Sequence, residues 1–132
     1  MIETFTDILA RRVSSSPDEG AFTFLADDGA PAAFTWSEVA RRVDAVAARL
    51  RGLGLAGGRA ILVYPPGPDF VFAFLGCLQA GVAAIPAYPP EPERLEATLP
   101  RLAAIAADAR PGAFLTTAWF LDLGRALAGM AP

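Results

Sequence analysis

The chain contains no lysine, histidine or asparagine, and all eleven of its basic residues are arginines. It therefore lacks the imidazole and amine groups on which most near-neutral base catalysis, imine chemistry and histidine metal sites depend. The single cysteine, Cys77, excludes an internal disulfide and is typical of a reducing compartment. These absences predict a cytoplasmic protein with little catalytic chemistry of its own.

Positive charge is also scarce, because 11 basic residues face 14 acidic ones and the pI is near 4.8. This balance argues against nucleic-acid binding, which normally needs a basic face. The first residues carry acids and no apolar core, so they do not resemble a secretory signal.

A membrane span has to be weighed for residues 70–90, which carry no charge and approach the roughly 20 residues that a bilayer requires. Gly81 and Pro86 divide this stretch, and a broken helix satisfies its backbone poorly in lipid. A helix followed by a strand explains it better, so no membrane span is predicted. Apolar residues still make up 54% of the chain, and we expect some apolar surface to meet another domain, a partner or a lipid.

Apolar periodicity and turn residues predict helices and strands along the whole chain. Helices are expected at residues 4–13, 35–52, 70–80 and 99–110 and after residue 117. Strands are expected at residues 21–25, 32–35, 59–64, 82–85 and 113–116. Thr35 and Glu38 fit a capping box, Asp69 is expected to cap the third helix, and Pro100 is expected in the first turn of the fourth.

The order of these elements predicts the fold class. The first two strands form a hairpin about Asp27-Asp28-Gly29, and the continuous apolar run at residues 59–64 suits a strand that is covered on both faces. The alternation that follows predicts an α/β fold, with a β-hairpin plus a short parallel sheet and covering helices. Its crossovers should be right-handed.

Two patterns could indicate a functional site, but a structural role explains each of them better. Gly52, Gly54 and Gly57 match the spacing of a dinucleotide-binding loop, but a predicted helix precedes them and a strand follows, which reverses the required order. Cys77 lies late in an apolar helix with no base nearby, so we expect a packing residue and not a nucleophile.

Two rigid turns follow predicted buried strands, at Tyr64-Pro65-Pro66 and Tyr88-Pro89-Pro90. Proline fixes φ and removes an amide donor, so both turns are stiff and end strand pairing. The spaced prolines Pro65-x-x-Pro68 and Pro89-x-x-Pro92 could alternatively be polyproline ligands for an SH3-type partner. The charged residues 91–96 are either a solvated loop or part of a ligand site, because open α/β sheets bind ligands beyond the carboxyl ends of their strands.

Several segments carry a resemblance to the adenylate-forming enzymes. Residues 34–39 (FTWSEV) resemble the first core motif of that superfamily, and residues 78–86 (LQAGVAAIP) resemble the second, in which Leu-x-Ala-Gly precedes a strand that ends in proline. The two Tyr-Pro-Pro triplets are similar to those of the fatty acyl-AMP ligase branch, and residues 101–109 continue the similarity. The chain is identified as an N-terminal fragment of such a ligase.

The resemblance implies that residues 1–132 form the front part of a large N-terminal adenylation domain and not a complete catalytic domain. Enzymes of this family use ATP and magnesium to convert a fatty acid to an acyl-adenylate, which fatty acyl-AMP ligases pass to an acyl carrier protein, commonly in polyketide or lipopeptide assembly. Their phosphate loop, ribose-binding aspartate and C-terminal lysine have no counterpart here. We therefore expect no catalytic, cofactor or metal residues, an inactive fragment, and as partners the rest of the domain, a fatty acid and an acyl carrier protein.

One site hypothesis follows from the resemblance. In related coenzyme A ligases the equivalent of the second Tyr-Pro-Pro loop lies near the path of the thiol nucleotide. A rigid acidic turn would narrow that path and repel an anionic nucleotide, while a less charged phosphopantetheine arm could enter elsewhere. The residues of this coenzyme A-excluding loop are Tyr88, Pro89, Pro90, Glu91, Glu93 and Arg94.

Two other functions stay open. The chain could be a non-catalytic module on the same scaffold, which dimerises or docks a carrier protein. It could also be the front segment of an acyl-CoA ligase or of an amino-acid-activating relative.

Overall fold

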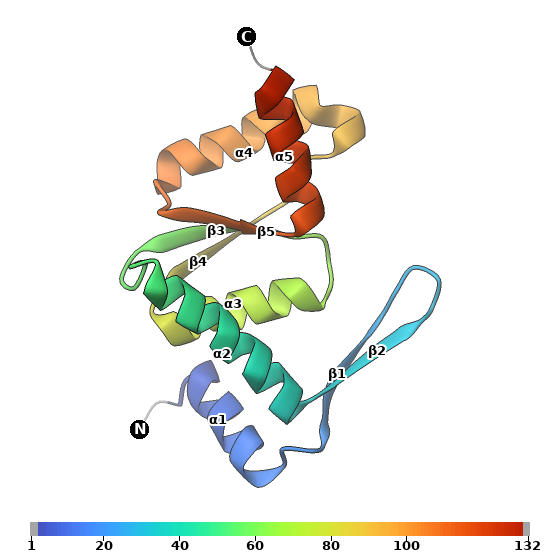
Figure 1. Cartoon of the computed structure of the whole chain (residues 1–132), viewed down its shortest axis with the longest axis vertical. Helices are drawn as coiled ribbons and strands as arrows, with labels where there is room; N and C mark the ends of the chain where they lie inside the picture. Colours follow the sequence, from blue (N-terminus) through green and yellow to red (C-terminus); the bar gives the residue numbers. More distant parts are fainter. Residues whose placement is uncertain (1–2, 131–132) are drawn as a thin grey trace.

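Within residues 3–130, which the computed structural model describes, three parallel strands form the central sheet (Figure 1). They lie in the order β4–β3–β5. Their bounds are Arg59–Val63 for β3, Ala83–Ala87 for β4 and Ala113–Thr116 for β5. At the centre, Ile61 of β3 pairs with Ile85 on one side and Phe114 on the other. The strand with the continuous apolar run is therefore the central one.

Helices cover both faces of the sheet, as Figure 1 shows. α2 and α3 lie on one face, and α4 and α5 lie on the other. Their bounds are Trp36–Gly52, Pro68–Ala80, Leu95–Ala109 and Ala118–Met130. Because α3 leads from β3 to β4 and α4 leads back past β3 to β5, right-handed crossovers place these two helices on opposite faces. The predicted α/β fold is confirmed.

The main core fills the space between the sheet and the helices α2 and α3. Leu62 of β3, Leu50 of α2 and Cys77 of α3 are buried in one cluster. Ile61, the neighbour of Leu62 on the strand, is also fully buried and faces the other side of the sheet. Burial of each of these leucine and isoleucine side chains contributes about 1.5–3 kcal/mol. β3 is covered on both faces, as predicted.

An antiparallel hairpin of β1 (Gly20–Leu25) and β2 (Pro31–Thr35) projects from the first turn of α2 (Figure 1). The ring centroid of Phe22 lies 5.8 Å from that of Phe34 on the hairpin and 6.2 Å from that of Phe72 on α3. These aromatic contacts join the base of the hairpin to a second buried cluster around α2. The hairpin prediction is confirmed.

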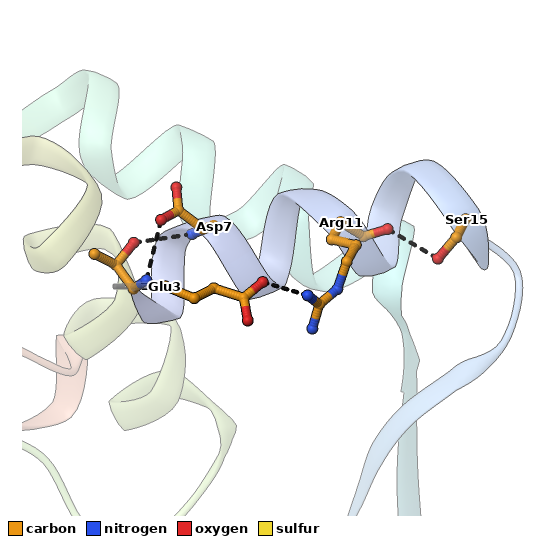
Figure 2. A network of polar contacts seen from close by, with 5 residues as sticks. Glu3, Asp7, Arg11 and Ser15 are labelled. Carbon is orange, nitrogen blue, oxygen red and sulfur yellow. Dashed lines mark hydrogen bonds and ion pairs between the residues drawn. The ribbon is translucent and has the colours of Figure 1, made fainter. Parts of the chain in front are cut away.

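Helix α1 (Phe5–Ser15) begins with a capping box, which Figure 2 shows. The amide of Thr4 donates to the Asp7 carboxylate at 3.0 Å, and the amide of Asp7 donates to the Thr4 hydroxyl at 3.1 Å. Arg11 forms an ion pair with Glu3, and the Ser15 hydroxyl donates to the Arg11 carbonyl at 2.9 Å. The backbone hydrogen bond from Thr4, followed by that from its side chain, lowers the pKa of Asp7.

Helix α2 begins with the second predicted capping box. The amide of Glu38 donates to the Thr35 hydroxyl at 3.2 Å, and the amide of Thr35 donates to the Glu38 carboxylate at 3.4 Å. Val39, Val43 and Leu50 are buried along one face of the helix. Both the start of this helix and its apolar stripe are confirmed.

The prediction that Asp69 caps α3 is wrong. The helix begins at Pro68, its capping residue is Gly67, and no side chain caps its first amides. Proline is favoured at a first helical position because its fixed φ suits the helix and its missing amide is not needed there. Asp69 therefore lies inside the first turn, where its charge suits the helix dipole.

The predicted start of α4 and the place of Pro100 in its first turn are also wrong. The helix begins at Leu95, so Pro100 lies inside it. The proline removes the amide that would bond the carbonyl of Glu96, and Glu96 is at the exposed surface, where water can satisfy that carbonyl. Pro86, predicted to follow its strand, lies within β4 opposite Leu62, which an edge strand tolerates.

Candidate functional site

The two Tyr-Pro-Pro triplets meet at one edge of the sheet. Tyr64 follows β3 and Tyr88 follows β4, and the carboxyl ends of these adjacent parallel strands lie side by side. A groove of about 910 Å³ runs along this edge, and we call it the Tyr-Pro-Pro groove. Its lining comprises Tyr64, Pro65, Pro66, Phe70, Pro86, Ala87, Tyr88, Pro89, Pro90, Glu91, Pro92, Thr98, Arg101, Leu102, Ile105 and Phe120.

The structure brings four of the six residues of the predicted loop into this groove. Tyr88, Pro89, Pro90 and Glu91 line it, whereas Glu93 and Arg94 do not. The latter two belong to a short 3-10 helix (Pro92–Arg94) that leads into α4. Tyr88 is 87% exposed, so it lies open at the surface.

The loop is tied to α4 by the hydroxyl of Thr98. The amide of Glu91 donates to this hydroxyl at 3.0 Å, and the hydroxyl donates to the carbonyl of Arg94 at 2.8 Å. Arg94 also forms an ion pair with Glu91 at 3.3 Å. The negative charge of Glu91 is therefore partly balanced, and the rigidity of the loop comes from Thr98 as well as from its prolines.

A second, apolar groove of about 390 Å³ lies on the sheet between α4 and α5. It is continuous with the Tyr-Pro-Pro groove, because Pro90, Leu102 and Phe120 line both. Phe114 of β5 lies in it and is 51% exposed, and Leu99 of α4 is also exposed. The large apolar fraction of the chain is thus partly explained by this open face.

Several residues that line these grooves were not predicted from the sequence. Phe120 of α5 belongs to both, but its role depends on β5 lying beside β3, which periodicity does not reveal. Arg101 and Leu102 project from a stretch of α4 whose start was misplaced. The spacing of Thr98, Leu102 and Ile105 on one helical face is the signal that could have identified this wall.

Tyr64 is half-buried at the end of β3. Burial, followed by the charges of Asp69 and Cys77, raises the pKa of its phenol to about 12. The strand end beside it is held by Thr116, whose hydroxyl donates to the carbonyl of Val63 at 2.7 Å. The first Tyr-Pro-Pro turn therefore starts from a fixed position, with a neutral phenol.

The other candidate residues have structural roles. Cys77 is fully buried, and burial raises the pKa of its thiol to about 11, which opposes reactivity. Gly52 ends α2 and Gly57 precedes β3, so the glycine pattern joins a helix to a strand as predicted. In the described residues 3–130, no three His, Cys, Asp or Glu side chains are grouped to hold a metal ion. No helix of that range is long and apolar enough to cross a membrane.

Comparison with known proteins identifies the family. Residues 9–130 match the family model described as AMP-binding enzyme. The chain is 38% identical over 114 residues to the long-chain-fatty-acid–AMP ligase FadD23 of Mycobacterium tuberculosis, a match that covers 83% of this chain and 19% of that protein. It is also 34% identical over 123 residues to the 4-hydroxyphenylalkanoate adenylyltransferase of Mycobacterium marinum. That match covers 90% of this chain and 19% of that protein.

A solved structure gives the same result. A fatty acyl-adenylate ligase from Legionella pneumophila, crystallised with acyl adenylate and pyrophosphate, matches with a TM-score of 0.84 and 31% identity, over 92% of this chain and 21% of that chain. The chain thus spans about a fifth of the length of these relatives. The resemblance to fatty acyl-AMP ligases is confirmed, and the chain belongs to the AMP-binding enzyme family.

Proposed function

We propose that this chain is the N-terminal portion of an ATP-dependent fatty acid–AMP ligase, acting in the cytoplasm to supply acyl-adenylate to an acyl carrier protein of a polyketide or lipopeptide pathway. The observation that carries the proposal is the meeting of both Tyr-Pro-Pro triplets in one groove at the carboxyl edge of the sheet. Ligands of open α/β sheets bind at that edge. The similarity to FadD23 supports the choice of a fatty acid as substrate.

We propose that the phosphate-binding and magnesium-binding residues lie outside this chain. The sequence has no lysine, and the described residues 3–130 hold no carboxylate cluster of the kind that magnesium binds. Phosphoryl chemistry needs cations or donors preorganised at the developing charge. We therefore assign ATP and magnesium to the rest of such an enzyme and propose that this chain alone is inactive.

The test compares the 132-residue chain with the product of its complete native reading frame. Each is incubated with ATP, magnesium and a long-chain fatty acid, and acyl-adenylate and pyrophosphate are measured. We expect adenylate from the complete product and none from the 132-residue chain. A reading frame that ends at Pro132, or a longer product that forms no adenylate, would contradict the proposal.

We further propose that the loop from Tyr88 to Arg94 hinders coenzyme A. Its contribution is mainly steric, because Pro89 and Pro90 stiffen the wall of the groove and Thr98 fixes the next turn. Repulsion by Glu91 is reduced by its ion pair with Arg94, so the charge of the loop is the smaller part.

Two double variants of the complete enzyme separate these contributions. Pro89→Gly with Pro90→Gly should raise the yield of acyl-coenzyme A, while Glu91→Gln with Glu93→Gln should raise it less. A matched control is Pro65→Gly with Pro66→Gly, which loosens the other Tyr-Pro-Pro turn of the same groove and should not raise the yield of acyl-coenzyme A. If neither loop variant gains coenzyme A turnover, the loop does not exclude the nucleotide.

A non-catalytic docking module is the second candidate, and the open apolar groove between α4 and α5 favours it. An evolved module should have covered its core apart from this groove and should stay monomeric, whereas a portion of a larger domain leaves apolar faces that associate. Sedimentation of the 132-residue chain and its binding of a hydrophobic dye distinguish the ligase portion from the docking module. Self-association with strong dye binding favours the ligase portion, whereas a stable monomer favours the module.

A further inference from the structure

The loops that follow β3 and β5 leave the sheet toward opposite faces. β3 leads through residues 64–67 into α3 on one face, and β5 leads through Thr117 into α5 on the other (Figure 1). The two strands are adjacent, and Val63 pairs with Thr116 at their ends. In open α/β sheets such a divergence opens a crevice at the carboxyl edge, where ligands bind. The topology therefore predicts a site between β3 and β5, whereas the Tyr-Pro-Pro groove follows β3 and β4.

A cleft of about 410 Å³ lies at this position. We call it the Arg42 cleft. Residues from α2, α3, the ends of β3 and β5, and the start of α5 line it, namely Arg42, Ala45, Val46, Tyr64, Asp69, Phe72, Ala73, Thr116, Thr117 and Ala118. Polar side chains therefore surround a partly apolar floor, as in small-molecule sites that orient a ligand with a few polar groups.

Arg42 supplies the positive charge of the cleft. The centre of its guanidinium lies 5.6 Å from the ring centroid of Phe34 and 5.4 Å from that of Phe72, so cation–π contacts hold it in place. Among the described residues 3–130, no carboxylate forms an ion pair with it. The cation is positioned by the hairpin and α3 but is not neutralised.

Two hydroxyl groups add donors to the cleft. Thr117 accepts the amide of Phe120 at 3.4 Å, which leaves its hydroxyl proton to donate. Tyr64 is half-buried, and its phenol is protonated at neutral pH and can donate. The Thr116 hydroxyl has no proton left for a ligand, because it donates to the carbonyl of Val63.

Asp69 is the acidic group of the same cleft. It lies in the first turn of α3, and within residues 3–130 it has no ion-pair partner. Arg42 and Asp69 thus present opposite charges to one space without contacting each other as an ion pair. A ligand that satisfied both would carry an anion toward Arg42 and a hydrogen-bond donor toward Asp69.

We propose that the Arg42 cleft binds a small organic acid that carries a hydroxyl or amino group next to its carboxylate and a short aliphatic chain. The carboxylate accepts from Arg42 and from the hydroxyls of Tyr64 and Thr117, and the neighbouring group donates to Asp69. The aliphatic chain covers the floor at Val46 and Ala73. The inference uses no residue of the coenzyme A-excluding loop, so it stands or fails separately from the proposed function.

Three matched probes test the two polar contacts. The 132-residue chain is titrated with 2-hydroxyhexanoate, hexanoate and hexane-1,2-diol, while amide shifts are followed in nitrogen–proton spectra. Each lost charge-assisted contact should weaken binding about tenfold, so the hydroxy acid should bind more tightly than either other probe. Shifts should centre on Thr117, Ala118 and the first turn of α3.

Variants locate the site. Arg42→Gln and Thr117→Val should each weaken binding of the hydroxy acid, and Asp69→Ala, which removes the acceptor, should remove its advantage over hexanoate. Arg41→Gln, a change at the exposed neighbouring position, is the control and should bind as the wild type does. Arg42→Lys keeps the charge and should retain part of the binding if Arg42→Gln proves unstable. Equal affinity for all three probes, or an unchanged affinity in both Arg42→Lys and Thr117→Val, would overturn the proposal.

Discussion

A Cβ atom placed on Gly76 of α3 would lie 2.4 Å from the Cγ1 atom of Val46 on α2. The two helices therefore cross with almost no space between the Gly76 backbone and the Val46 side chain. This close approach brings α2 and α3 together on one face of the sheet, where Leu50 and Cys77 are buried with Leu62. It also places Arg42 and Val46 of α2 at the end of β3, where the Arg42 cleft lies.

Gly76→Ala should destabilise the chain by about 1–3 kcal/mol, because the added methyl group overpacks a contact between two helices. Chemical denaturation followed by circular dichroism measures this loss. Gly124→Ala in α5 is the matched control, since a Cβ there meets nothing within 4 Å. That variant should be unchanged or up to about 1 kcal/mol more stable, as alanine favours helices. Equal effects of the two changes would contradict the close packing.

Thr35→Ala should cost about 1 kcal/mol of unfolding free energy, because the amide of Glu38 loses the hydroxyl that caps α2. Denaturation midpoints measure the effect. Ser37→Ala, two residues further along the chain, removes a hydroxyl that does not cap the helix and should change stability by less. If both variants lose the same stability, the capping box does not stabilise α2 as described.

Cys77 should not react with an aromatic disulfide reagent at pH 8 in the folded chain, because its thiol is buried and its pKa is raised to about 11. Full reaction should appear only on unfolding in denaturant. Leu53→Cys provides an exposed thiol for comparison, since Leu53 is 55% exposed, and it should react at once. Rapid reaction of Cys77 in the native chain would show that the α2–α3 core opens readily.

The free energy of unfolding should fall as the pH rises from about 10 to about 12. Burial raises the pKa of Tyr64 from 10.0 to about 12, so the folded phenol keeps its proton where the unfolded one loses it. The unfolded state then binds fewer protons, and the stability present below pH 10 is lost as pH rises toward 12. Melting temperatures across this range measure the loss. Tyr64→Phe should show a smaller decline, and an identical decline would exclude Tyr64 as its source.

Local sequence signals predicted most of the fold because the forces involved act over a few residues. Thr35 and Glu38 satisfy each other across one helical turn, and the hairpin turn lies between two short strands. The β–α–β rule also brings the two Tyr-Pro-Pro turns to one edge, since β3 and β4 must be parallel neighbours.

The misplaced features depend on contacts between distant parts of the chain. Pro100 lies inside α4 because the helix starts earlier, where Thr98 bonds to both Glu91 and Arg94. The Arg42 cleft requires β5 to lie beside β3, on the side away from β4. The order of the strands in the sheet cannot be read from the apolar periodicity of any single helix or strand.

The most direct test of the account is a chimera in which this chain replaces the section of FadD23 to which it aligns, assayed for acyl-adenylate by mass spectrometry. FadD23 lacking that section and intact FadD23 are the two controls. If this chain supplies the N-terminal portion of a fatty acid–AMP ligase, the chimera should form long-chain acyl-adenylate and the shortened protein should not. A chimera that folds and binds ATP but makes no adenylate would contradict the central claim.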